Sequence, residues 1–294
     1  MQRYFNLIGR GKGEFTMRLM VMGDFHYSRM ESRSAEMLAA RDEAFSTMLG
    51  KFLEWDADLH ISLGDLTHEG HPEELEFVFD SIESSGRPFI HVLGNHDTLS
   101  LPKNEILTIT GQQRYHAIDR EEAMLLFIDT TKEMNADDWG GEMDEEQLQW
   151  LDAQLETSGD KPVFIFAHHP VYATTERSSN EKGSIHPGIK MKEVLKKKEG
   201  FGFYFCGHNH VNSIVKLDGW HYIQTAACLD NPAFRVVDLS EGKVKISHIP
   251  IDDNTLADHI TKFHKGMPGF EPTEKPHGEE TDRSLVVDAT KEPL

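Results

Sequence analysis

The stretch YFCGHNHV, residues 204–211, joins an apolar run to two histidines that lie one residue apart. Phe203 and Phe205 belong to a run that is typical of a buried strand, and Gly207 ends this run. His208 and His210 follow directly. A glycine at such a point permits a sharp turn and a close approach of the backbone to a bound group. The stretch therefore predicts a strand whose carboxyl end presents two imidazoles.

Four other apolar runs end in polar residues of the same kind. The runs cover residues 18–24, 58–65, 88–95 and 162–169, and they end in Gly-Asp, Gly-Asp, Gly-Asn and His-His. In chain order, the polar ends of all five runs are Asp24 and His26, then Asp65, then Asn95, His96 and Asp97, then His168 and His169, then His208 and His210. Ligands of α/β sheets bind beyond the carboxyl ends of the strands. If the strands lie side by side, these polar ends converge.

The segments between the runs read as helices, and the later segments read as hairpins. A helical pattern begins near Pro72 and stops at Gly86, and another begins at a capping pattern of Asp144 and Gln147. After residue 212, short strands turn at 218–219 and at 241–242. The sequence therefore predicts a mixed α/β domain that ends in antiparallel strands.

The residue types at the strand ends favour a metal centre. Leaving aside His96, Asp97 and His169, they offer two aspartates, four histidines and one asparagine. The absence of thiolate argues against structural zinc and iron–sulfur sites, and the many nitrogens argue against Mg²⁺ and Ca²⁺. Imidazole with carboxylate suits Mn²⁺, Fe²⁺, Zn²⁺ or Co²⁺. Seven ligands are too many for one such ion, and they suit two ions that share a carboxylate.

Each pattern has a simpler interpretation when it is taken alone. A single D-x-H occurs by chance, and Gly-Asp after a strand commonly caps a turn. His60 and His91 lie inside predicted strands and are better interpreted as core residues. The metal interpretation gains its weight because all five patterns occur in order, each at the end of an apolar run.

Together the five patterns resemble the signature of the calcineurin-like metallophosphoesterases, D-x-H, G-D, G-N-H-[DE], H and G-H-x-H. In this chain they read GDFH, LGDLT, GNHD, AHHP and GHNH, within residues 23–210. The layout of GDLTHEG, EQLQWL and AHHPVY is most similar to a bacterial branch that includes class III cyclic-nucleotide phosphodiesterases and glycerophosphodiesterases. The resemblance implies a four-layer αββα sandwich of mixed sheets, with a dinuclear metal site at the carboxyl ends of the strands.

The resemblance also implies roles for individual residues. It assigns two overlapping ligand sets, which are Asp24, His26, Asp65 and His210 for one ion, and Asp65, Asn95, His168 and His208 for the other. Asp65 would therefore bridge the two ions. His96 would face the substrate, and it would bind a phosphoryl oxygen or protonate the leaving group. His169 would support the site by packing. Some family phosphatases orient the substrate-facing histidine with an aspartate three residues after the bridging one. His68 stands at that position here, so Asp97 is the candidate for this role.

The activity that the resemblance implies is hydrolysis of a phosphoester by a hydroxide that two divalent transition-metal ions, Mn, Fe or Zn, activate. The branch favours a small phosphodiester of the cyclic-nucleotide or glycerophosphodiester type. A phosphomonoester or a nucleotide pyrophosphate is the alternative substrate. A non-catalytic binding scaffold is a remote alternative, since such members lose ligands and none is missing here. Members of the branch often dimerise, which leaves a homo-oligomer open. We expect the loops at 131–142 and 172–187 to shape the pocket.

Composition limits the partners and the location of the chain. Asp and Glu total 50 against 30 Lys and Arg, and the formal net charge is −20. Such a chain lacks the general positive field that binds nucleic-acid backbones or anionic membranes. An anionic substrate therefore requires a local cation. No run approaches the roughly 18 apolar residues of a membrane span, and no signal peptide is recognisable. With two cysteines, Cys206 and Cys228, a reduced, cytoplasmic protein is expected.

We expect three segments along the chain, namely a flexible leader at 1–16, a metallophosphoesterase domain at 17–252 and an acidic tail at 253–294. The tail holds four of the 12 prolines and has weak periodicity. It is therefore expected to be extended or partly disordered. Within it, SLVVDA at 284–289 could still dock as an edge strand.

Overall fold

Two six-stranded mixed sheets lie at the centre of the computed structural model, which describes residues 16–31 and 33–290. The first sheet contains, in spatial order, β12 (Ser284–Asp288), β11 (Lys243–Pro250), β10 (Ala233–Ser240), β1 (Met17–Met22), β2 (Leu59–Ser62) and β3 (Phe89–His91). The second contains β4 (His116–Asp119), β5 (Met124–Phe127), β6 (Val163–Phe166), β7 (Gly202–Cys206), β9 (Trp220–Gln224) and β8 (Ser213–Leu217).

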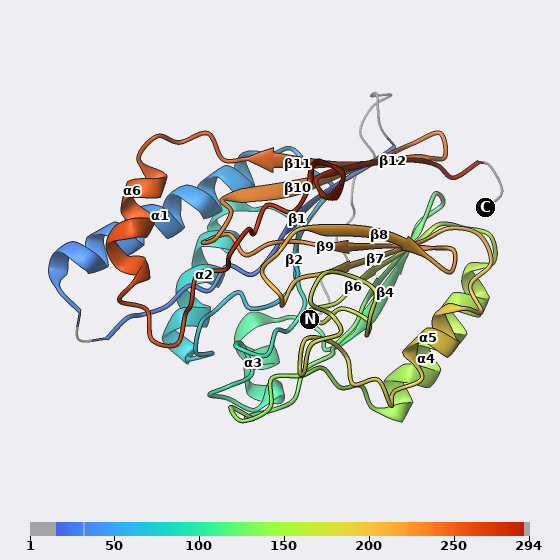
Figure 1. Cartoon of the computed structure of the whole chain (residues 1–294), viewed down its shortest axis with the longest axis horizontal. Helices are drawn as coiled ribbons and strands as arrows, with labels where there is room; N and C mark the ends of the chain where they lie inside the picture. The colour runs from blue at the N-terminus through green and yellow to red at the C-terminus, as the bar shows by residue number, and fades with distance from the viewer. Residues whose placement is uncertain (1–15, 32, 291–294) are drawn as a thin grey trace.

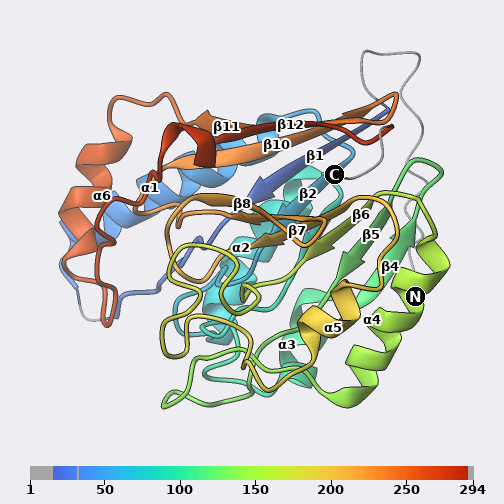
Figure 2. The same ribbon diagram turned by 45° about the vertical axis from the view of Figure 1, so that its right-hand side comes forward.

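Helices cover the outer faces of both sheets. They are α1 (Ala35–Glu54), α2 (Pro72–Ser85), α3 (Lys103–Thr110), α4 (Glu145–Ser158), α5 (Met191–Leu195), α6 (Leu256–His264) and the 3₁₀ helix η1 (Glu280–Asp282). Helices α1, α2 and α6 lie outside the first sheet, and α4 and α5 lie outside the second (Figure 1). The view in Figure 2 shows the same order of layers. The predicted four-layer αββα sandwich is confirmed.

The long apolar runs of the sequence are strands that are buried on both faces. Leu19 and Val21 of β1 face the core between the sheets, whereas Met20 and Met22 face the core under α1. In β7, Phe203 and Phe205 likewise face the space between the sheets, and Tyr204 and Cys206 face α4 and α5. Because both faces of β1 and β7 are buried, apolar side chains occupy both faces, and the alternation of a half-buried strand is absent.

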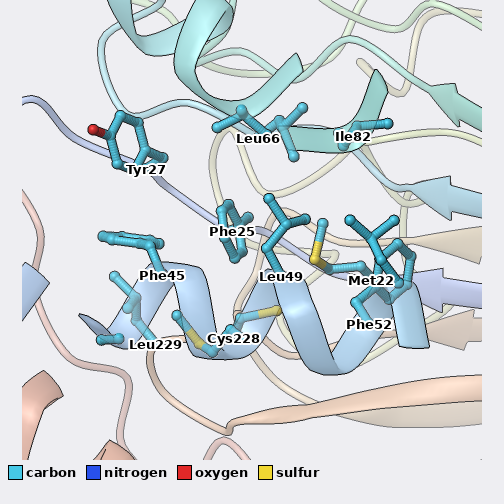
Figure 3. Packing of buried hydrophobic residues seen from close by; sticks show 14 of the residues in the cluster. Met22, Phe25, Tyr27, Phe45, Leu49, Phe52, Leu66, Ile82, Cys228 and Leu229 are labelled. Atoms are coloured by element: carbon cyan, nitrogen blue, oxygen red, sulfur yellow. The ribbon is translucent and has the colours of Figure 1, made fainter. Parts of the chain in front are cut away.

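The core under the first sheet fixes where α1 and α2 lie. Phe45, Leu49 and Phe52 of α1 pack towards Met22, the last residue of β1, and towards Phe25, which lies between Asp24 and His26 (Figure 3). Phe25 and Phe45 meet edge to face, with ring centroids 5.0 Å apart. Burial of these large side chains makes the segment after β1 a rigid base for the residues that follow it.

Local signals explain where several helices begin and end. The Asp144 carboxylate accepts a hydrogen bond from the Gln147 N–H at 2.8 Å, as a helix N-cap does. Pro72 opens α2, and Gly86 ends it with a φ of 65°. These helix boundaries agree with the sequence prediction.

The tail differs from the sequence prediction, because its described part is folded. Leu256, Ile260 and Phe263 form one buried face of α6, which packs against α1. Strand β12 pairs with β11 in the antiparallel sense and confirms the predicted edge strand. The prediction of an extended or partly disordered tail is therefore wrong for these elements, since three apolar side chains at helical spacing suffice to dock a short helix. Of the predicted leader at 1–16, only Thr16 lies within the described residues.

Candidate metal centre

Every predicted ligand follows the carboxyl end of a strand that runs parallel to a neighbouring strand. Asp24 and His26 follow β1, Asp65 follows β2, Asn95 follows β3, His168 follows β6, and His208 and His210 follow β7. Strands β1, β2 and β3 are parallel in one sheet, and β5, β6 and β7 are parallel in the other. The Asp24 carboxylate accepts the His208 N–H at 3.1 Å, so the ends of the two sheets meet at this point.

One half of the centre contains His26 and His210. Their Nε2 atoms lie 3.0 Å apart, and the His26 Nε2 lies 3.9 Å from Asp65 Oδ2. His26, His210 and Asp65 each offer a ligand atom within 4.8 Å of the others. This half matches three members of the first predicted ligand set.

The other half contains Asn95, His168 and His208. Asn95 Oδ1 lies 2.9 Å from His168 Nε2 and 3.0 Å from His208 Nδ1, and these two nitrogens are 3.2 Å apart. The three side chains come from three different strands, so the fold alone brings them together. They match the second predicted set.

Asp65 lies between the two halves. Its Oδ2 is 3.3 Å from His168 Nε2 and 3.9 Å from His26 Nε2, while its Oδ1 accepts the His96 N–H at 2.8 Å. The backbone of His96 thus orients the carboxylate so that one oxygen faces both halves. Asp24 also groups with Asp65 and His168, and its carboxylate lies at the junction of the sheets. All seven predicted ligands are therefore brought together.

The ligand rings are held in the manner of metal-binding histidines. The second nitrogen of three rings meets an acceptor, with His168 Nδ1 2.9 Å from Leu63 O, His208 Nε2 2.9 Å from Lys182 O and His210 Nδ1 3.2 Å from Asp230 Oδ2. A nitrogen that donates to a carbonyl leaves the lone pair of a neutral ring on its other nitrogen. In neutral rings these inner nitrogens carry the lone pairs, and they approach one another closely, at 3.2 Å between His168 Nε2 and His208 Nδ1 and at 3.0 Å between His210 Nε2 and His26 Nε2. A cation bound between them would stabilise this arrangement. The donor set therefore fits transition-metal ions.

Charges inside the centre shift several pKa values. Burial lowers the pKa of His168, but the Asp65 and Asp24 carboxylates outweigh burial and raise this pKa to about 9. Burial opposes ionisation of Asp65 as well, yet His168 and His96 hold its pKa well below the usual range. Burial and the charge of His168 lower the pKa of His208 to about 3. The Asp65 carboxylate therefore stays ionised, whereas burial raises the pKa of the neighbouring Asp24. Bound metal ions would supply positive charge to both carboxylates.

Four of the seven ligands adopt the left-handed backbone conformation. The φ angles are 54° at His26, 47° at Asp65, 72° at His208 and 56° at His210. Residues with side chains rarely adopt such angles, and strained backbone gathers at functional sites. The fold tolerates this strain where it turns the ligand side chains inward.

Two glycines make room for ligand carboxylates. A Cβ at Gly207 would lie 2.7 Å from the nearer Asp24 oxygen, and a Cβ at Gly94 would lie 2.0 Å from the Asp65 nitrogen. Glycine therefore ends the strand before His208 because the carboxylate of β1 occupies the place of a side chain. The close approach that the sequence predicted is real, but it is made to a neighbouring ligand.

His96 lies at the rim of the centre and is positioned by a residue that the sequence analysis did not select. Its Nδ1 donates to the His68 carbonyl oxygen at 2.6 Å, and its ring stacks on the His68 ring with centroids 5.0 Å apart. Among the described residues, the His96 Nε2 has no hydrogen-bond partner. Its Nε2 is therefore the nitrogen that is free to meet a substrate.

The expectation that Asp97 orients His96 is corrected by the structure. Asp97 is fully buried, and its carboxylate accepts the Thr67 N–H, the Thr67 hydroxyl and the Gly94 N–H, each at 2.8 Å. His91 Nε2 lies 3.2 Å from the same carboxylate. Asp97 thus ties together the loops after β2 and β3, and the hydrogen bond to the His96 ring is made by the His68 carbonyl oxygen instead.

His169 differs from its neighbour His168, because protein groups contact both of its ring nitrogens. Its Nδ1 lies 2.9 Å from the Thr130 hydroxyl, and its Nε2 lies 2.8 Å from the Trp139 carbonyl oxygen. Its ring packs against those of His168 and His208. No nitrogen is left to bind a metal, which agrees with the supporting role expected for His169.

The sequence analysis missed two groups at the centre, and both involve the C-terminal region. Asp230 accepts from His210 and also from the Thr273 N–H at 3.1 Å. The Phe270 ring packs on His26 and His210, with centroids 5.3 Å and 5.6 Å away. Neither residue belongs to a motif. Asp230 lies in the loop between β9 and β10, and Phe270 lies in the C-terminal tail, so only the fold brings them to the site.

The fold and the ligand arrangement define a metallophosphoesterase type of centre at the end of a two-sheet sandwich. The model of the calcineurin-like phosphoesterase family matches residues 17–212, and the chain belongs to this family. A glycerophosphodiester phosphodiesterase from Enterobacter lignolyticus is 28% identical over 159 residues, which cover 52% of this chain and 56% of that relative. The chain thus spans little more than half of that relative's length.

Two further comparisons extend over more of the chain. A protein from Rhodopseudomonas palustris that is named a probable cyclic nucleotide phosphodiesterase is 24% identical over 80% of this chain and 86% of its own length. The structure of a dimetal phosphatase from Danio rerio has a TM-score of 0.67 at 16% identity and covers 82% of this chain and 98% of that chain. This structural likeness supports the fold. Within residues 16–31 and 33–290, no helix is long and apolar enough to cross a membrane.

Proposed function

We propose that the chain is a metal-dependent phosphoesterase that hydrolyses a small phosphodiester. The observation that carries this proposal is the pair of ligand clusters that Asp65 joins, with the His96 Nε2 open beside them. The relatives named for glycerophosphodiesters and cyclic nucleotides support a diester over a monoester. A nucleotide pyrophosphate or a phosphomonoester is the alternative substrate.

The proposed metal ligands are those expected from the sequence. One ion would be held by Asp24, His26, Asp65 and His210, and the other by Asp65, Asn95, His168 and His208. Mixed nitrogen and oxygen donors without thiolate suit Mn²⁺, Fe²⁺ or Zn²⁺. When bound, such ions would supply positive charge for the phosphoryl oxygens and a strong nucleophile at neutral pH.

His96 is the proposed proton donor. Because its Nδ1 donates to a carbonyl oxygen, its Nε2 carries a proton only when the ring is an imidazolium. In that form the Nε2–H points from the rim and can protonate the leaving oxygen or bind a phosphoryl oxygen. The stacked ring of His68 fixes the plane of His96. We therefore assign His96 to general acid catalysis, with His68 as its positioning residue.

The environment and assembly of the chain stay predictions. Cys206 and Cys228 are both buried and unpaired, which accords with a reducing, cytoplasmic environment. A homo-oligomer is carried over from the resemblance alone, and size-exclusion chromatography with light scattering would test it.

The proposal is tested by comparing the hydrolysis of bis-(p-nitrophenyl) phosphate and p-nitrophenyl phosphate, with Mn²⁺ and with a chelator. We expect metal-dependent turnover that favours the diester. A preference for the monoester would replace the phosphodiesterase assignment with a phosphatase. Absence of turnover with both would favour a binding scaffold.

A further inference from the structure

Two exposed apolar side chains lie on the loop at 131–142, beside the metal centre. Trp139 is 48% exposed and Met134 is 55% exposed. Single exposed apolar side chains are common on protein surfaces, so exposure alone does not mark a binding position. Their place next to a candidate active site makes them candidates for substrate contact.

The loop is held in place by its own hydrogen bonds. The Lys132 ammonium contacts the Asp138 carboxylate, which also accepts the Gly140 N–H at 3.1 Å. The Asp138 N–H in turn donates to Asn135 Oδ1 at 3.1 Å. These contacts fix the turn that carries Met134 and Trp139, so the two side chains are presented by an ordered loop.

The loop is also tied to both sides of the metal centre. The Trp139 carbonyl oxygen accepts from His169 Nε2 at 2.8 Å, and the His169 ring lies 4.3 Å from the His208 ring. At the other side, the Met134 N–H donates to the Thr98 carbonyl oxygen at 2.8 Å, and Thr98 follows the loop that carries His96. Trp139 and Met134 therefore flank the centre.

Lys182 places a cation on the same rim. Its ammonium lies 4.1 Å from the centroid of the Trp139 ring and donates to the Asp137 carbonyl oxygen at 2.7 Å. Its own carbonyl oxygen accepts from His208 Nε2 at 2.9 Å. Lys182 covers part of the indole, and the remaining exposed half is available for a stacked ring.

We propose that Trp139, with Met134 and Lys182, forms an outer subsite for the nucleoside part of a phosphodiester, in which the planar base stacks on the indole. The inference rests on the proposed function and narrows its substrate class. A nucleobase gains stacking on the indole, whereas a glycerol or ethanolamine group has no flat apolar surface to offer. The subsite would therefore favour cyclic nucleotides over glycerophosphodiesters.

The test compares wild-type protein and Trp139→Ala on two diesters, adenosine 3′,5′-cyclic phosphate and glycerophosphoethanolamine. The ratio of variant to wild type for each substrate removes the intrinsic reactivity of that substrate. We expect kcat/KM for the cyclic nucleotide to fall by roughly tenfold to hundredfold, mainly through KM, with less than about a twofold change for glycerophosphoethanolamine. Trp139→Phe keeps a flat ring and should restore most of the loss.

Leu217→Ala is the control. Leu217 is an exposed apolar residue, 36% exposed, at the end of β8. Because β8 is antiparallel to β9 and β9 is parallel to β7, this end of β8 lies at the opposite end of the sheet from the metal centre. This variant should keep wild-type kinetics for both substrates. Equal losses for both substrates in Trp139→Ala would overturn the inference, because they would show that Trp139 only supports His169. A changed molecular mass with equal losses would also overturn it and would mark the loop as an interface between copies.

Binding of AMP, measured by calorimetry, separates this inference from the proposed function. If wild-type protein hydrolyses neither diester, the proposed function fails, and AMP affinity alone decides the inference. An affinity that falls about tenfold in Trp139→Ala supports the subsite, whereas equal affinities overturn it.

Discussion

At the residue scale, the partners of each histidine ring determine what that histidine can do. His168 and His169 are adjacent and both are fully buried, yet only His168 directs a nitrogen at Asn95 and Asp65. The ring of His169 is contacted by Thr130 and by the Trp139 carbonyl oxygen. Those partners come from a loop some thirty to forty positions earlier in the chain. A sequence motif cannot distinguish the two rings on physical grounds, but the folded contacts can.

Asp65 is the residue on which both proposed ions depend. Asp65→Asn should reduce the bound metal and lower the rate of diester hydrolysis by at least roughly 100-fold, because an amide cannot bridge two cations as a carboxylate does. Elemental analysis of the purified variant and its turnover of bis-(p-nitrophenyl) phosphate check this together. Asp152→Asn, on the surface of α4, is the control and should behave as wild type. Full activity in Asp65→Asn would defeat the shared-ligand assignment.

His96 should affect turnover without affecting metal content. Replacement by Asn removes the proposed proton donor, and kcat should fall by roughly 10²–10⁴-fold. The metal content should stay at the wild-type level, since none of the proposed ligand sets includes this ring. Elemental analysis and steady-state kinetics on the same preparation give both readouts. An unchanged kcat would remove His96 from the chemistry.

His60 should make folding stability depend on pH. It lies in β2, where neither ring nitrogen has a hydrogen-bond partner among the residues that the structure describes, and burial lowers its pKa to about 4. The unfolded chain takes up this proton near pH 6.5, so stability is lost as the pH falls from about 6.5 towards about 4. His60→Phe should therefore show a smaller drop in melting temperature between pH 7.5 and pH 5 than wild type does.

This comparison is best made in chelator, so that metal binding does not contribute. His186→Phe changes an exposed loop histidine and should keep the wild-type drop. An identical drop in His60→Phe and wild type would show that the His60 ring does not stay neutral in the folded chain.

At the element scale, the C-terminal region completes the first-sheet half of the metal centre. The His68 ring lies 2.5 Å from the Pro268 carbonyl oxygen through its Nε2, and Phe270 covers His26 and His210. Helix α6 holds the start of this segment on α1, and β12 holds its end on β11. The tail, whose hydrophobic periodicity is weak in the sequence, therefore contributes residues that line the metal centre.

Phe263 is the anchor of α6. Its ring is fully buried and lies 5.5 Å from Phe45 of α1 between centroids. Phe263→Ala should lower the free energy of unfolding by about 3–5 kcal/mol, since it leaves a cavity in a packed core. Urea unfolding of the metal-free protein measures this change. Thr261→Ala, at an exposed position of the same helix, should change it by less than about 0.5 kcal/mol. A loss below about 1 kcal/mol in Phe263→Ala would show that α6 is not docked.

At the scale of the whole molecule, the sequence predicted the features that occur several times along the chain, namely apolar runs that end in polar residues. The runs of β1, β2, β3, β6 and β7 are recognisable because burial on both faces makes most of their residues apolar, with exceptions such as His60, Ser62 and His91. Their polar ends then give the seven ligands in order. The rest could not be predicted, because it depends on which distant segments meet. Examples are Asp230 beside His210, the His68 carbonyl beside His96, and α6 on α1.

The charge of the chain makes the metal centre the main attraction for an anionic substrate. The net charge is −20, so the surface as a whole repels phosphate esters. Asp24 and Asp65 are buried within the centre and would share their negative charge with bound ions. Two divalent ions against two carboxylates leave the centre positive. The proposed reaction therefore requires metal for binding as well as for chemistry.

The most direct measurement is a titration of chelator-treated protein with Mn²⁺, in which bound metal and the rate of bis-(p-nitrophenyl) phosphate hydrolysis are followed together. We predict no hydrolysis by the metal-free chain, and a rate that rises until two ions are bound per chain. Hydrolysis before any metal is added, or a rate that is complete with one ion bound, would contradict a two-ion centre joined by Asp65.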